Sequence, residues 1–582
     1  MANDFRTIKT PHAAVIVWNY VDRIGTEGMT ASPQSSGVAP GKILETEPQI
    51  ISTLSLISIQ TSKSKGQPNG QFQLTLAPTK NWTSVLTSGS WVAILMSNEP
   101  ITKDDLKKAN KKQVKMIGKI ESVRVETQQV DSERQTRYYV TGTDWGHIFN
   151  SVVYVDNLLA GKNDPVSQGN AAAVALRNAL FGGGGTPHAF NVDDNLRSII
   201  QIFGQSLKGF TKAGKDINRL AKAVYTFKIP KEMKDFFDLR DANNNPAASN
   251  NIAQILSLRS GILIGPDQYK PSNEAQGFIN PFSLQGQNNI WQILLENSNP
   301  VLNEMYTEMR WSDDSVPDNA LSLTIYNRIK PFAFKSFTGE AGSSSGIKSY
   351  FQWIKAHKID NNTVISVNAG TNWRDKYNFI EIKPDFQDMT VFANWYKQKS
   401  QAFDEKAFER EGFRPLIAGT KQFPSGGGNK GGKVNVDWNL LSVWARAMRE
   451  WYFNTHRMLN GTLVMHGTTP YIAVGDNIQF DAGLINPTAN INDYTVRSGK
   501  NQNILAHIES VTHGFTINGD ARNYTTTIQF VRGIIVYESG KIVGRGTLDK
   551  YTTSVPENID NNTKNIVSTS TEADPGDPVR GQ

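Results

Sequence analysis

The stretch GGNKGGKV, from Gly427 to Val434, is the strongest candidate for a phosphate-binding loop. Gly427, Gly432 and Lys433 match most of the pattern in which backbone N–H groups surround phosphates and a lysine reaches them. Val434 follows the lysine where Mg²⁺ binding needs a hydroxyl, and KQFPS precedes the glycines where a buried strand is needed. We interpret this segment as a flexible loop.

Two further stretches match motif letters without their structural context. Gly342, Ser344 and Gly346 satisfy G-x-S-x-G, but a nucleophile elbow requires a buried strand before the serine and a helix after it. Here the lead-in is FTGEA and the loop is made of Gly and Ser. FGGGGTPH, from Phe181, lacks the strand, helix and following acid of a dinucleotide site. The first is interpreted as a chance match in a linker, and the second is a weak signal at best.

Histidines and carboxylates give no stronger signal. The 8 histidines show no H-x-x-x-H or H-E-x-x-H spacing, and we expect His456, His466, His507 and His513 to be structural or exposed. The adjacent acids Asp313-Asp314 are typical of a solvated surface loop. A glycan hydrolase needs two carboxylates across a cleft, which a sequence alone does not test. We predict no catalytic, cofactor-binding or metal-binding residues, no cofactor and no enzymatic activity.

Length and composition narrow the class of protein. The 582 residues predict two to four domains, and the absence of cysteine excludes disulfides, thiolate metal sites and cysteine nucleophiles. No apolar run approaches the roughly 18 residues of a membrane-spanning helix, and the amino end shows no secretory signal. The net charge of +7 is mild for this length and favours a solvated surface over a nucleic-acid face. The densest basic run, beginning at Lys103, has no aromatic residues for base stacking and is predicted to be a loop.

The tetrapeptide Ile-Glu-Ser-Val occurs twice, beginning at Ile120 and at Ile508. Four matching letters are expected by chance in a long chain, so the flanking sequence must decide. At an offset of 508 − 120 = 388, GKIESVRVETQQVDSERQTRYYVTG lies beside AHIESVTHGFTINGDARNYTTTIQF. Each copy passes from an apolar run through a polar turn into an alternating, β-rich run. The predicted turns are Asp131-Ser132 and Asn518-Gly519.

The agreement between the two copies extends upstream. Gly89 lies 31 residues before Ile120, and Gly475 lies 33 residues before Ile508. Each glycine precedes a short apolar strand. The nearly constant spacing of these landmarks favours a β-barrel or sandwich unit that is present twice. The alternative is two unrelated hairpin domains that share four letters.

The middle of the chain is predicted to be partly helical. A first helix is expected after Asp193 and Asp194, with one apolar face formed by Leu196, Ile199, Ile200, Phe203 and Leu207. A second helical stretch, NIWQILLENSNPVLNEMYTEMRW, is expected to break at Asn299-Pro300. A third is expected from about Asp437 to Asn454, with a core-facing stripe of Leu441, Trp444, Met448, Trp451 and Tyr452. The polar end of the chain, from Val555, is predicted to be disordered or ordered only against a partner.

Three stretches resemble the phage tail baseplate hub family, relatives of the T4 hub and of the amino-terminal part of contractile-injection spike proteins. The first is NWTSVLTSGSWVAILMSN followed by MIGKIESVRVETQQVDSERQTRYYVTGTDWGHIF. The second is IWQILLENSNPVLNEMYTEMRW followed by LSLTIYNRIKPF, and the third is MLNGTLVMHGTTPYIAVGDNIQF followed by NILAHIESVTHGFTINGDARNYTTTIQF. Together they cover most of the chain, while the segment from about Leu158 to Gln285 matches least well.

The resemblance implies an α+β, mainly β fold with two similar tube-type β-barrels flanking a mixed helical and β middle region. The expected divisions are residues 1–157 (an arm and the first barrel), 158–285 (a helical and loop insertion), 286–435 (a mixed α/β domain), 436–548 (a helix and the second barrel) and 549–582 (a flexible tail). No single functional residue is carried over, because such proteins work through surfaces.

The resemblance also implies a function and partners. Three copies with two barrels each would form a pseudo-sixfold ring that adapts a hexameric tail tube to a trimeric spike around a DNA channel. The implied partners are two further copies of the chain, a trimeric spike or tip protein, a tail tube or tube-initiator protein, baseplate wedge proteins and a tape measure protein, while DNA passes without specific binding. The implied location is the virion tail baseplate, assembled in the host cytoplasm.

Two other functions stay open at the level of sequence. One is a tail-associated hydrolase of peptidoglycan or polysaccharide, suggested by the poorly matched middle segment. The other is a nucleic-acid-binding protein, suggested only by the basic balance; steeply salt-dependent binding to duplex DNA would support it.

Overall fold

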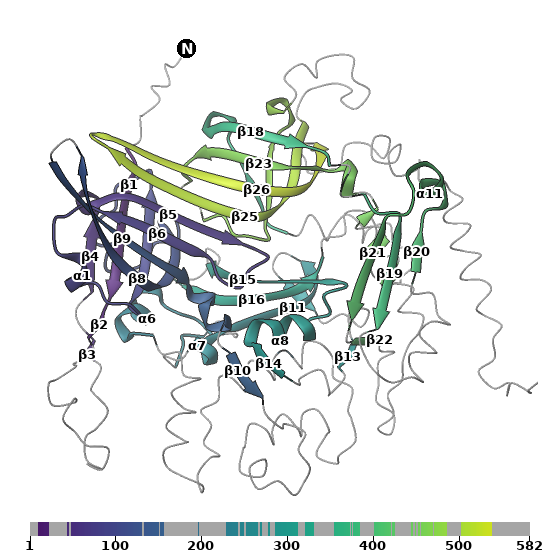
Figure 1. The fold of residues 1–582 in the computed structure, drawn as a ribbon, viewed down its shortest axis with the longest axis horizontal. Helices are drawn as coiled ribbons and strands as arrows, with labels where there is room; N and C mark the ends of the chain where they lie inside the picture. The colour runs from purple at the N-terminus through teal and green to yellow at the C-terminus, as the bar shows by residue number, and fades with distance from the viewer. Residues whose placement is uncertain are drawn as a thin grey trace, which may run out of the picture.

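The computed structural model is built mainly from β-strands (Figure 1). It describes residues 10–21, 44–45, 48–130, 133–150, 152–155, 196, 229–241, 245–248, 252–265, 268–270, 277–279, 286–311, 320–330, 354–372, 374, 376–384, 401–420, 422–424, 444–445, 448–449, 452–453, 455–468, 471–485 and 502–537. Among these residues, no helix has the length and apolar character needed to cross a bilayer.

One large sheet of 13 strands dominates the fold. Its main path runs β18-β23-β26-β25-β5-β6-β9-β8-β7-β1-β4, while β24 pairs with β25 and with β17. The strands from the first part of the chain are β1 (His12–Trp18), β4 (Gln49–Ser52), β5 (Leu56–Ser64), β6 (Gln71–Leu76), β7 (Trp91–Ser97), β8 (Val114–Val130) and β9 (Glu133–Asp144). Those from the later part are β17 (Ala356–Lys358), β18 (Val364–Gly370), β23 (Leu459–His466), β24 (Asn477–Asp481), β25 (Gln502–Asn518) and β26 (Ala521–Tyr537).

The two parts of this sheet have the same strand order. The first module, as we call β5 to β9, is ordered β5-β6-β9-β8-β7, and the second module is ordered β18-β23-β26-β25-β24. In both modules the chain visits the five positions in the same sequence, and every neighbouring pair is antiparallel. The shared topology that the repeated tetrapeptide predicts is therefore present.

The repeated tetrapeptide forms the same irregularity in each module. The pairing of β8 with β9 shifts between positions 120 and 122, which leaves Glu121 as an extra residue. The pairing of β25 with β26 shifts between positions 508 and 510, which leaves Glu509 as an extra residue. Such a β-bulge bends the strand and changes the direction of a side chain. Each module therefore contains the same bend at Ile-Glu-Ser-Val, and the glutamate is the bulged residue in both.

A second bulge recurs on the outermost strand of each module. The pairing of β5 with β6 shifts around Ile57, and the pairing of β18 with β23 shifts around Ile365. Each strand follows a 3₁₀ turn, η1 (Thr53–Ser55) in the first module and η5 (Asn361–Thr363) in the second. The offset from one module to the other is therefore 361 − 53 = 308 on this strand.

Gly89 and Gly475 occupy equivalent corners. The Gly89 N–H donates to the Ile120 carbonyl at 2.7 Å, and the Gly475 N–H donates to the Ile508 carbonyl at 3.0 Å. Both glycines have positive φ, +90° and +82°, a region that is strained for residues with a side chain. The upstream landmark in the sequence therefore marks the entry into β7 and β24.

The modules differ at one edge. Next to the first module, β1 lies between β7 and β4 and is antiparallel to both. The counterpart of β4 is β17, which precedes η5 and pairs directly with β24 in parallel. The first module thus has one additional strand beside it, and β17 and β18 of the second module come from the segment assigned above to the mixed middle domain.

The hairpin turn of the second module is shifted by one residue from its prediction. Asn518 pairs with Ala521 in the ladder, so the two-residue turn is Gly519-Asp520 and not Asn518-Gly519. Gly519 alone supplies the positive φ, +61°. In the first module Val130 pairs with Glu133. The turn predicted between them, at Asp131-Ser132, lies outside the described residues.

A smaller sheet below the junction of the modules contains β12-β11-β16-β15 (Figure 1). The helix α8 (Ile290–Asn297) has Asn289 as its N-cap, and the Asn289 side chain accepts from the Gln292 N–H at 2.7 Å. The helical prediction beyond Asn299-Pro300 is wrong: Asn299 has φ +57°, and β15 (Asn303–Trp311) follows. Pairing with β16 (Leu321–Ile329) and burial of nearly every β15 side chain outweigh the helical spacing of its apolar residues.

The remaining elements surround these sheets. The basic run after Lys103 lies in the connection between β7 and β8, as predicted. The remaining strands are β2 (Tyr20–Val21), β3 (Leu44–Glu45), β10 (Val152–Val155), β11 (Ser257–Gly265), β12 (Gln268–Lys270), β13 (Gly277–Ile279), β14 (Gly286–Asn289), β19 (Phe379–Pro384), β20 (Gln401–Phe403), β21 (Pro415–Thr420) and β22 (Gln422–Pro424). The short helices are α1 (Trp82–Val85), α6 (Lys231–Phe237), α7 (Ile252–Ile255) and α11 (Glu405–Glu411), with 3₁₀ turns η2 (Trp145–Asn150), η7 (Thr455–Arg457) and η8 (Ala482–Leu484).

Each module curls around a buried apolar cluster, and Phe515 and Tyr524 of the second module join the cluster of the first. In the first module Ile59 of β5 and Val92 of β7, from opposite ends of the strand order, belong to one buried cluster with Leu74 and Val140. In the second module Val367 of β18 packs against the cluster that contains Ile478 of β24. No strand pair within the described residues closes either module on itself. The mainly β architecture is established, and barrel closure remains a proposal.

Most of the predicted first helix and the polar end of the chain lie outside the described residues. Leu196 is buried in the large middle cluster, whereas its predicted helical partners are not described. In the third predicted helix, Trp444 and Met448 are buried as expected of a core-facing stripe.

Candidate functional site at the junction of the two modules

The modules are joined by backbone pairing between β25 and β5. Up to the bulge at Glu509, one edge of β25 pairs with β24; beyond it, residues 510–516 pair antiparallel with β5. The Lys65 N–H donates to the Glu509 carbonyl at 2.8 Å, and the Thr512 hydroxyl donates to the Ser62 hydroxyl at 3.2 Å. The bend at the bulge therefore lets one strand serve two neighbours in succession.

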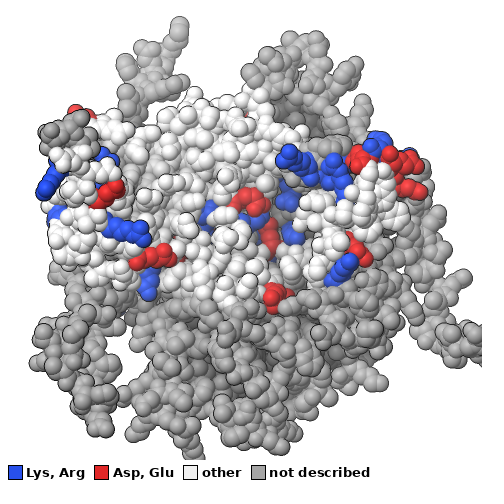
Figure 2. Space-filling model, viewed as in Figure 1, with Lys and Arg blue, Asp and Glu red and all other residues white. Residues whose placement is uncertain are grey.

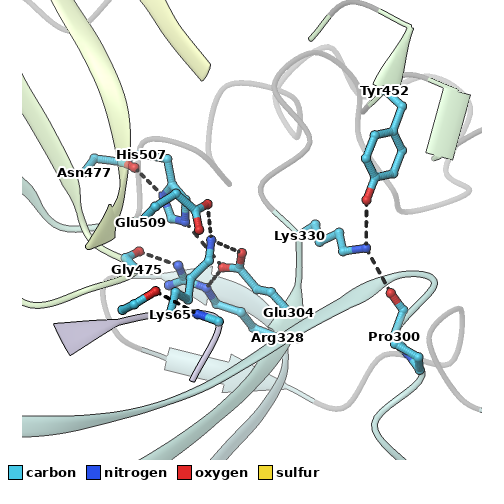
Figure 3. Close-up of polar contacts among 12 residues, drawn as sticks. Lys65, Pro300, Glu304, Arg328, Lys330, Tyr452, Gly475, Asn477, His507 and Glu509 are labelled. Atoms are coloured by element: carbon cyan, nitrogen blue, oxygen red, sulfur yellow. Dashed lines mark hydrogen bonds and ion pairs between the residues drawn. The ribbon is translucent and has the colours of Figure 1, made fainter. Parts of the chain in front are cut away.

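A buried group of charges lies beside this seam (Figure 3). Lys65 Nζ lies 2.7 Å from Glu509 Oε1 and 2.9 Å from Glu304 Oε2, so it links both modules to β15. Arg328 of β16 donates through Nε to Glu304 Oε1 at 2.7 Å and through Nη2 to the Gly475 carbonyl. Two cations thus face two carboxylates. We call Lys65, Glu304, Arg328, His507 and Glu509 the junction cluster.

The electrostatics of the junction cluster favour a balanced set of charges. Burial opposes ionisation of Glu304, but Lys65 and Arg328 outweigh it and hold the pKa of Glu304 well below its usual value. Burial, with Lys65 nearby, lowers the pKa of His507 to about 4, so this histidine is neutral at pH 7. Its Nδ1 lies 3.0 Å from Asn477 Oδ1 on β24. The cluster therefore holds two positive and two negative charges.

A second group of polar contacts ties β15 to both modules. Lys63 of β5 pairs with Asp144 of β9, and its Nζ donates to Thr307 Oγ1 at 2.9 Å. The next residue of β15, Glu308, accepts from the Val474 N–H at 2.9 Å and from the Tyr471 hydroxyl. Burial raises the pKa of Glu308 to about 7. Strand β15 therefore contacts the first module through Thr307 and the second through Glu308.

Shape reinforces these contacts at the Gly475 corner. A Cβ at Gly475 would lie 2.3 Å from Tyr306 Cζ, so the corner and the Tyr306 ring approach more closely than any side chain allows. The Tyr306 ring stacks on Tyr326 at 4.9 Å between centroids, and Arg328 lies over the same ring. The positive φ and the close approach both require glycine here.

Another amine, on the half-buried Lys330, extends the polar contacts just beyond the end of β16. Lys330 Nζ donates to the Pro300 carbonyl at 2.9 Å and lies 3.4 Å from the Tyr452 hydroxyl (Figure 3). Burial lowers the pKa of Lys330 to about 7.

The junction can therefore hold two sheet modules in a fixed relation, and it offers no evident chemistry. Within the described residues, no group of three or more His, Asp or Glu side chains could hold a metal ion. The sequence motifs at Gly427–Val434, Gly342–Gly346, Phe181 and Asp313-Asp314 lie outside the described residues.

The four histidines singled out in the sequence are dispersed. His466 is exposed and His456 is buried. His507 belongs to the junction cluster, and His513 is buried against Thr526, with Nδ1 and Oγ1 3.0 Å apart.

Sequence reasoning missed Lys65, Glu304 and Arg328. The signal was present on β5, where Lys63 and Lys65 continue the inward phase of Ile59 and Thr61. On β15 the burial of every residue from 303 to 309 includes Glu304 and does not follow from the sequence, which mixes polar and apolar residues. A charge in a buried phase is expensive unless it is paired, so these residues required partners that the sequence did not identify.

Charges on the described surface form no continuous stripe in the view of Figure 2, where Lys and Arg side chains lie among Asp and Glu side chains. The broad area over β23 and β26 in this view carries few charged side chains. The described part of this face therefore lacks the dense basic track that a backbone-binding nucleic-acid groove needs.

Comparison with known proteins yields remote structural matches and no family assignment. No family model matches the chain, and no curated protein does. Among solved structures, a tail protein from Neisseria meningitidis MC58 is 10% identical, with 90% of this chain and 96% of that chain covered and a TM-score of 0.38. The 43 kDa tail protein of prophage MuSo2 from Shewanella oneidensis is 11% identical, with coverage of 89% and 98% and a TM-score of 0.37.

A further similar structure is the prophage tail protein gp18 from Listeria monocytogenes EGD-e, 9% identical, with coverage of 88% and 94% and a TM-score of 0.33. A Francisella PdpA–VgrG complex is 8% identical, with coverage of 90% and 53% and a TM-score of 0.32. Likeness at this level assigns no function to the chain.

Proposed function

We propose that this chain is a structural hub of a phage or phage-like tail baseplate. Three copies, each with two equivalent sheet modules, form a ring of six modules that adapts a hexameric tail tube to a trimeric spike around a DNA channel. The chain works through its surfaces and has no catalytic role. The single observation that supports this most strongly is the presence of two modules with one strand order, one pair of bulges and one glycine corner in the same chain.

The physical argument concerns symmetry. A trimer of a chain with one module offers three equivalent surfaces, whereas a trimer of a duplicated chain offers six surfaces that are nearly equivalent. The two modules must then be held side by side in a fixed relation. The β5–β25 pairing and the junction cluster do this, because backbone hydrogen bonds and buried ion pairs both constrain the relation between the modules.

We further propose that each module is a tube-type barrel. The curl of each module around a buried apolar cluster supports this, since strands from opposite ends of the order share buried neighbours. The remaining gap would be covered by neighbouring modules in the ring, which also removes exposed strand edges. The expected partners are a tube or tube-initiator protein on one side and a trimeric spike on the other, with wedge proteins outside and a tape measure protein within.

Light scattering on the purified full-length chain tests the proposal. At concentrations up to tens of micromolar we expect a particle of three chains, each of 64.5 kDa. A particle that stays at one chain over this range, with the chain folded by circular dichroism, would refute the hub function. A salt-dependent tight complex with duplex DNA would favour nucleic-acid binding over passage, because a channel wall that holds DNA opposes its movement.

A further inference from the structure

The edge of β8 beyond its bulge has no strand partner within the described residues. β9 pairs with one side of β8 along residues 118–130, and β7 pairs with the other side only as far as Lys119. In the second module the counterpart of this stretch is residues 510–516 of β25, which pair with β5. The same segment is therefore covered in one module and open in the other.

Among the described strands, β18 also has one side without a partner. β18 pairs with β23 on one side and ends the path of the large sheet on the other. Its counterpart β5 has the same bulge and the same preceding 3₁₀ turn, and its outer side is covered by β25. The internal seam joins β25 to β5, and among the described strands the counterparts of both, β8 and β18, have an unpaired edge.

Each of these two edges also exposes an apolar side chain. Val125 of β8 is 53% exposed, whereas its counterpart His513, which pairs with Thr61 of β5, is 4% exposed. Ile365, the bulged residue of β18, is 49% exposed. Long, unpaired edges with apolar side chains are pairing sites unless something protects them, and such exposure marks an interaction surface.

We propose that the β8 edge of one copy pairs with the β18 edge of a second copy of this chain, in the register of the internal β25–β5 seam. Transferring that register by the offsets 388 and 308 places Arg124 opposite Gly370, Val125 opposite Ala369 and Glu126 opposite Asn368. The pairing is antiparallel, as it is between β25 and β5. Val125 becomes buried as His513 is.

This contact is head-to-tail. The two edges are different, so a copy that uses β8 on one neighbour still presents β18 to the next, and repetition closes a ring or continues without limit. A contact of β8 with β8 would leave both β18 edges open. Closure after three copies rests on the proposed function, whereas the pairing of the two edges does not.

Engineered cysteines test the pairing without background, because the chain contains none. Arg124→Cys and Gly370→Cys place thiols at the counterparts of Thr512 and Ser62, whose hydroxyls lie 3.2 Å apart. Arg124 is exposed, and a Cβ at Gly370 has no neighbour within 4 Å, so neither change disturbs packing. The internal control is Ser62→Cys with Thr512→Cys, which should form a disulfide within one chain.

After mild oxidation we expect the Arg124→Cys/Gly370→Cys chain to run as a covalent trimer in denaturing gels, with the internal control remaining a single chain. Each single variant should give no covalent species. Links between copies of one single variant would overturn the proposal, because they require a symmetric contact. A trimer by light scattering in which the double variant fails to link, while the internal control does link, would overturn the pairing and leave the hub function standing.

Two other outcomes separate the proposals. A covalent ladder that extends beyond three copies would confirm the edge pairing and refute the closed trimer. A chain that stays single and forms no link would refute both.

A backbone variant gives an independent readout. The Lys65 N–H donates to the Glu509 carbonyl, so alternation along β25 directs the N–H groups of Val511, His513 and Phe515 toward β5. By the same alternation, the N–H of Val125 points to the open edge. Val125→Pro removes that donor and leaves the β8–β9 ladder intact, which an edge strand tolerates. For Val125→Pro we expect single chains, because the pairing between copies is lost, and an unchanged melting temperature of the monomer, because the β8–β9 ladder is kept. Persistence of the trimer would contradict the pairing. Val125→Ala, which keeps the N–H, is the matched control.

Discussion

Removing the charge of Glu304 should be the most damaging conservative change at the junction. Its carboxylate binds Lys65 at 2.9 Å and Arg328 at 2.7 Å, and its side chain is only 7% exposed. Glu304→Gln keeps the shape and leaves two buried cations without this counter-charge. Breaking a buried pair by removing one partner costs about 3–5 kcal/mol. With a urea m-value of about 3 kcal/mol/M, this corresponds to a fall of about 1 M or more in the unfolding midpoint.

Glu509→Gln is the matched control, because Glu509 also binds Lys65 but its side chain is 31% exposed. Solvent screens such a pair, and we expect a loss within about 1 kcal/mol. Urea unfolding followed by tryptophan fluorescence should therefore separate the two variants clearly. Equal losses, or a loss below about 1 kcal/mol for Glu304→Gln, would show that the junction cluster does not hold the modules in place.

Three further results are expected. Lowering the pH should remove the stabilisation that Glu304 provides, because a carboxylate whose folded pKa is depressed stabilises the fold fully above its unfolded pKa of about 4.5 and loses that contribution as pH falls through the folded value. Acid unfolding of Glu304→Gln should therefore show a shallower pH dependence below pH 4.5. Glu308 should have the opposite effect on stability, because its folded pKa is raised to about 7 and its burial lowers the stability of the fold as pH rises from 4.5 to 7. In unfolding measured at a series of pH values, Glu308→Gln should reduce the dependence of stability on pH in this range. Gly475→Ala should lower the melting temperature far more than Gly519→Ala, since both have positive φ but only Gly475 would drive a Cβ to 2.3 Å from Tyr306, and similar losses in the two variants would contradict the close packing.

The duplication could be predicted from the sequence because its landmarks are local. A bulge at Glu121 and Glu509 and a glycine with positive φ each need particular residues at particular positions, and these survive as Ile-Glu-Ser-Val and as Gly89 and Gly475. The hairpin turn was misplaced by one residue because Asn-Gly is the common turn pair, whereas the ladder extends to Asn518 and Ala521.

What the sequence did not reveal depends on pairing between distant segments. β15 has helical spacing of its apolar residues and becomes a strand because β16 pairs with it along its length. Lys65 meets Glu304 across 239 residues and Glu509 across 444, so no local pattern could identify the junction cluster. β17 and β18 are likewise short strands whose place is fixed only by β24 and β23.

An electron-microscopy average of the purified particle, viewed down its symmetry axis, tests the central claim most directly. We predict a ring with threefold symmetry and six lobes, in which first and second modules alternate around the channel. A ring of three lobes, or a particle in which the two modules of a chain occupy unlike radii, would contradict the use of duplication to imitate sixfold symmetry.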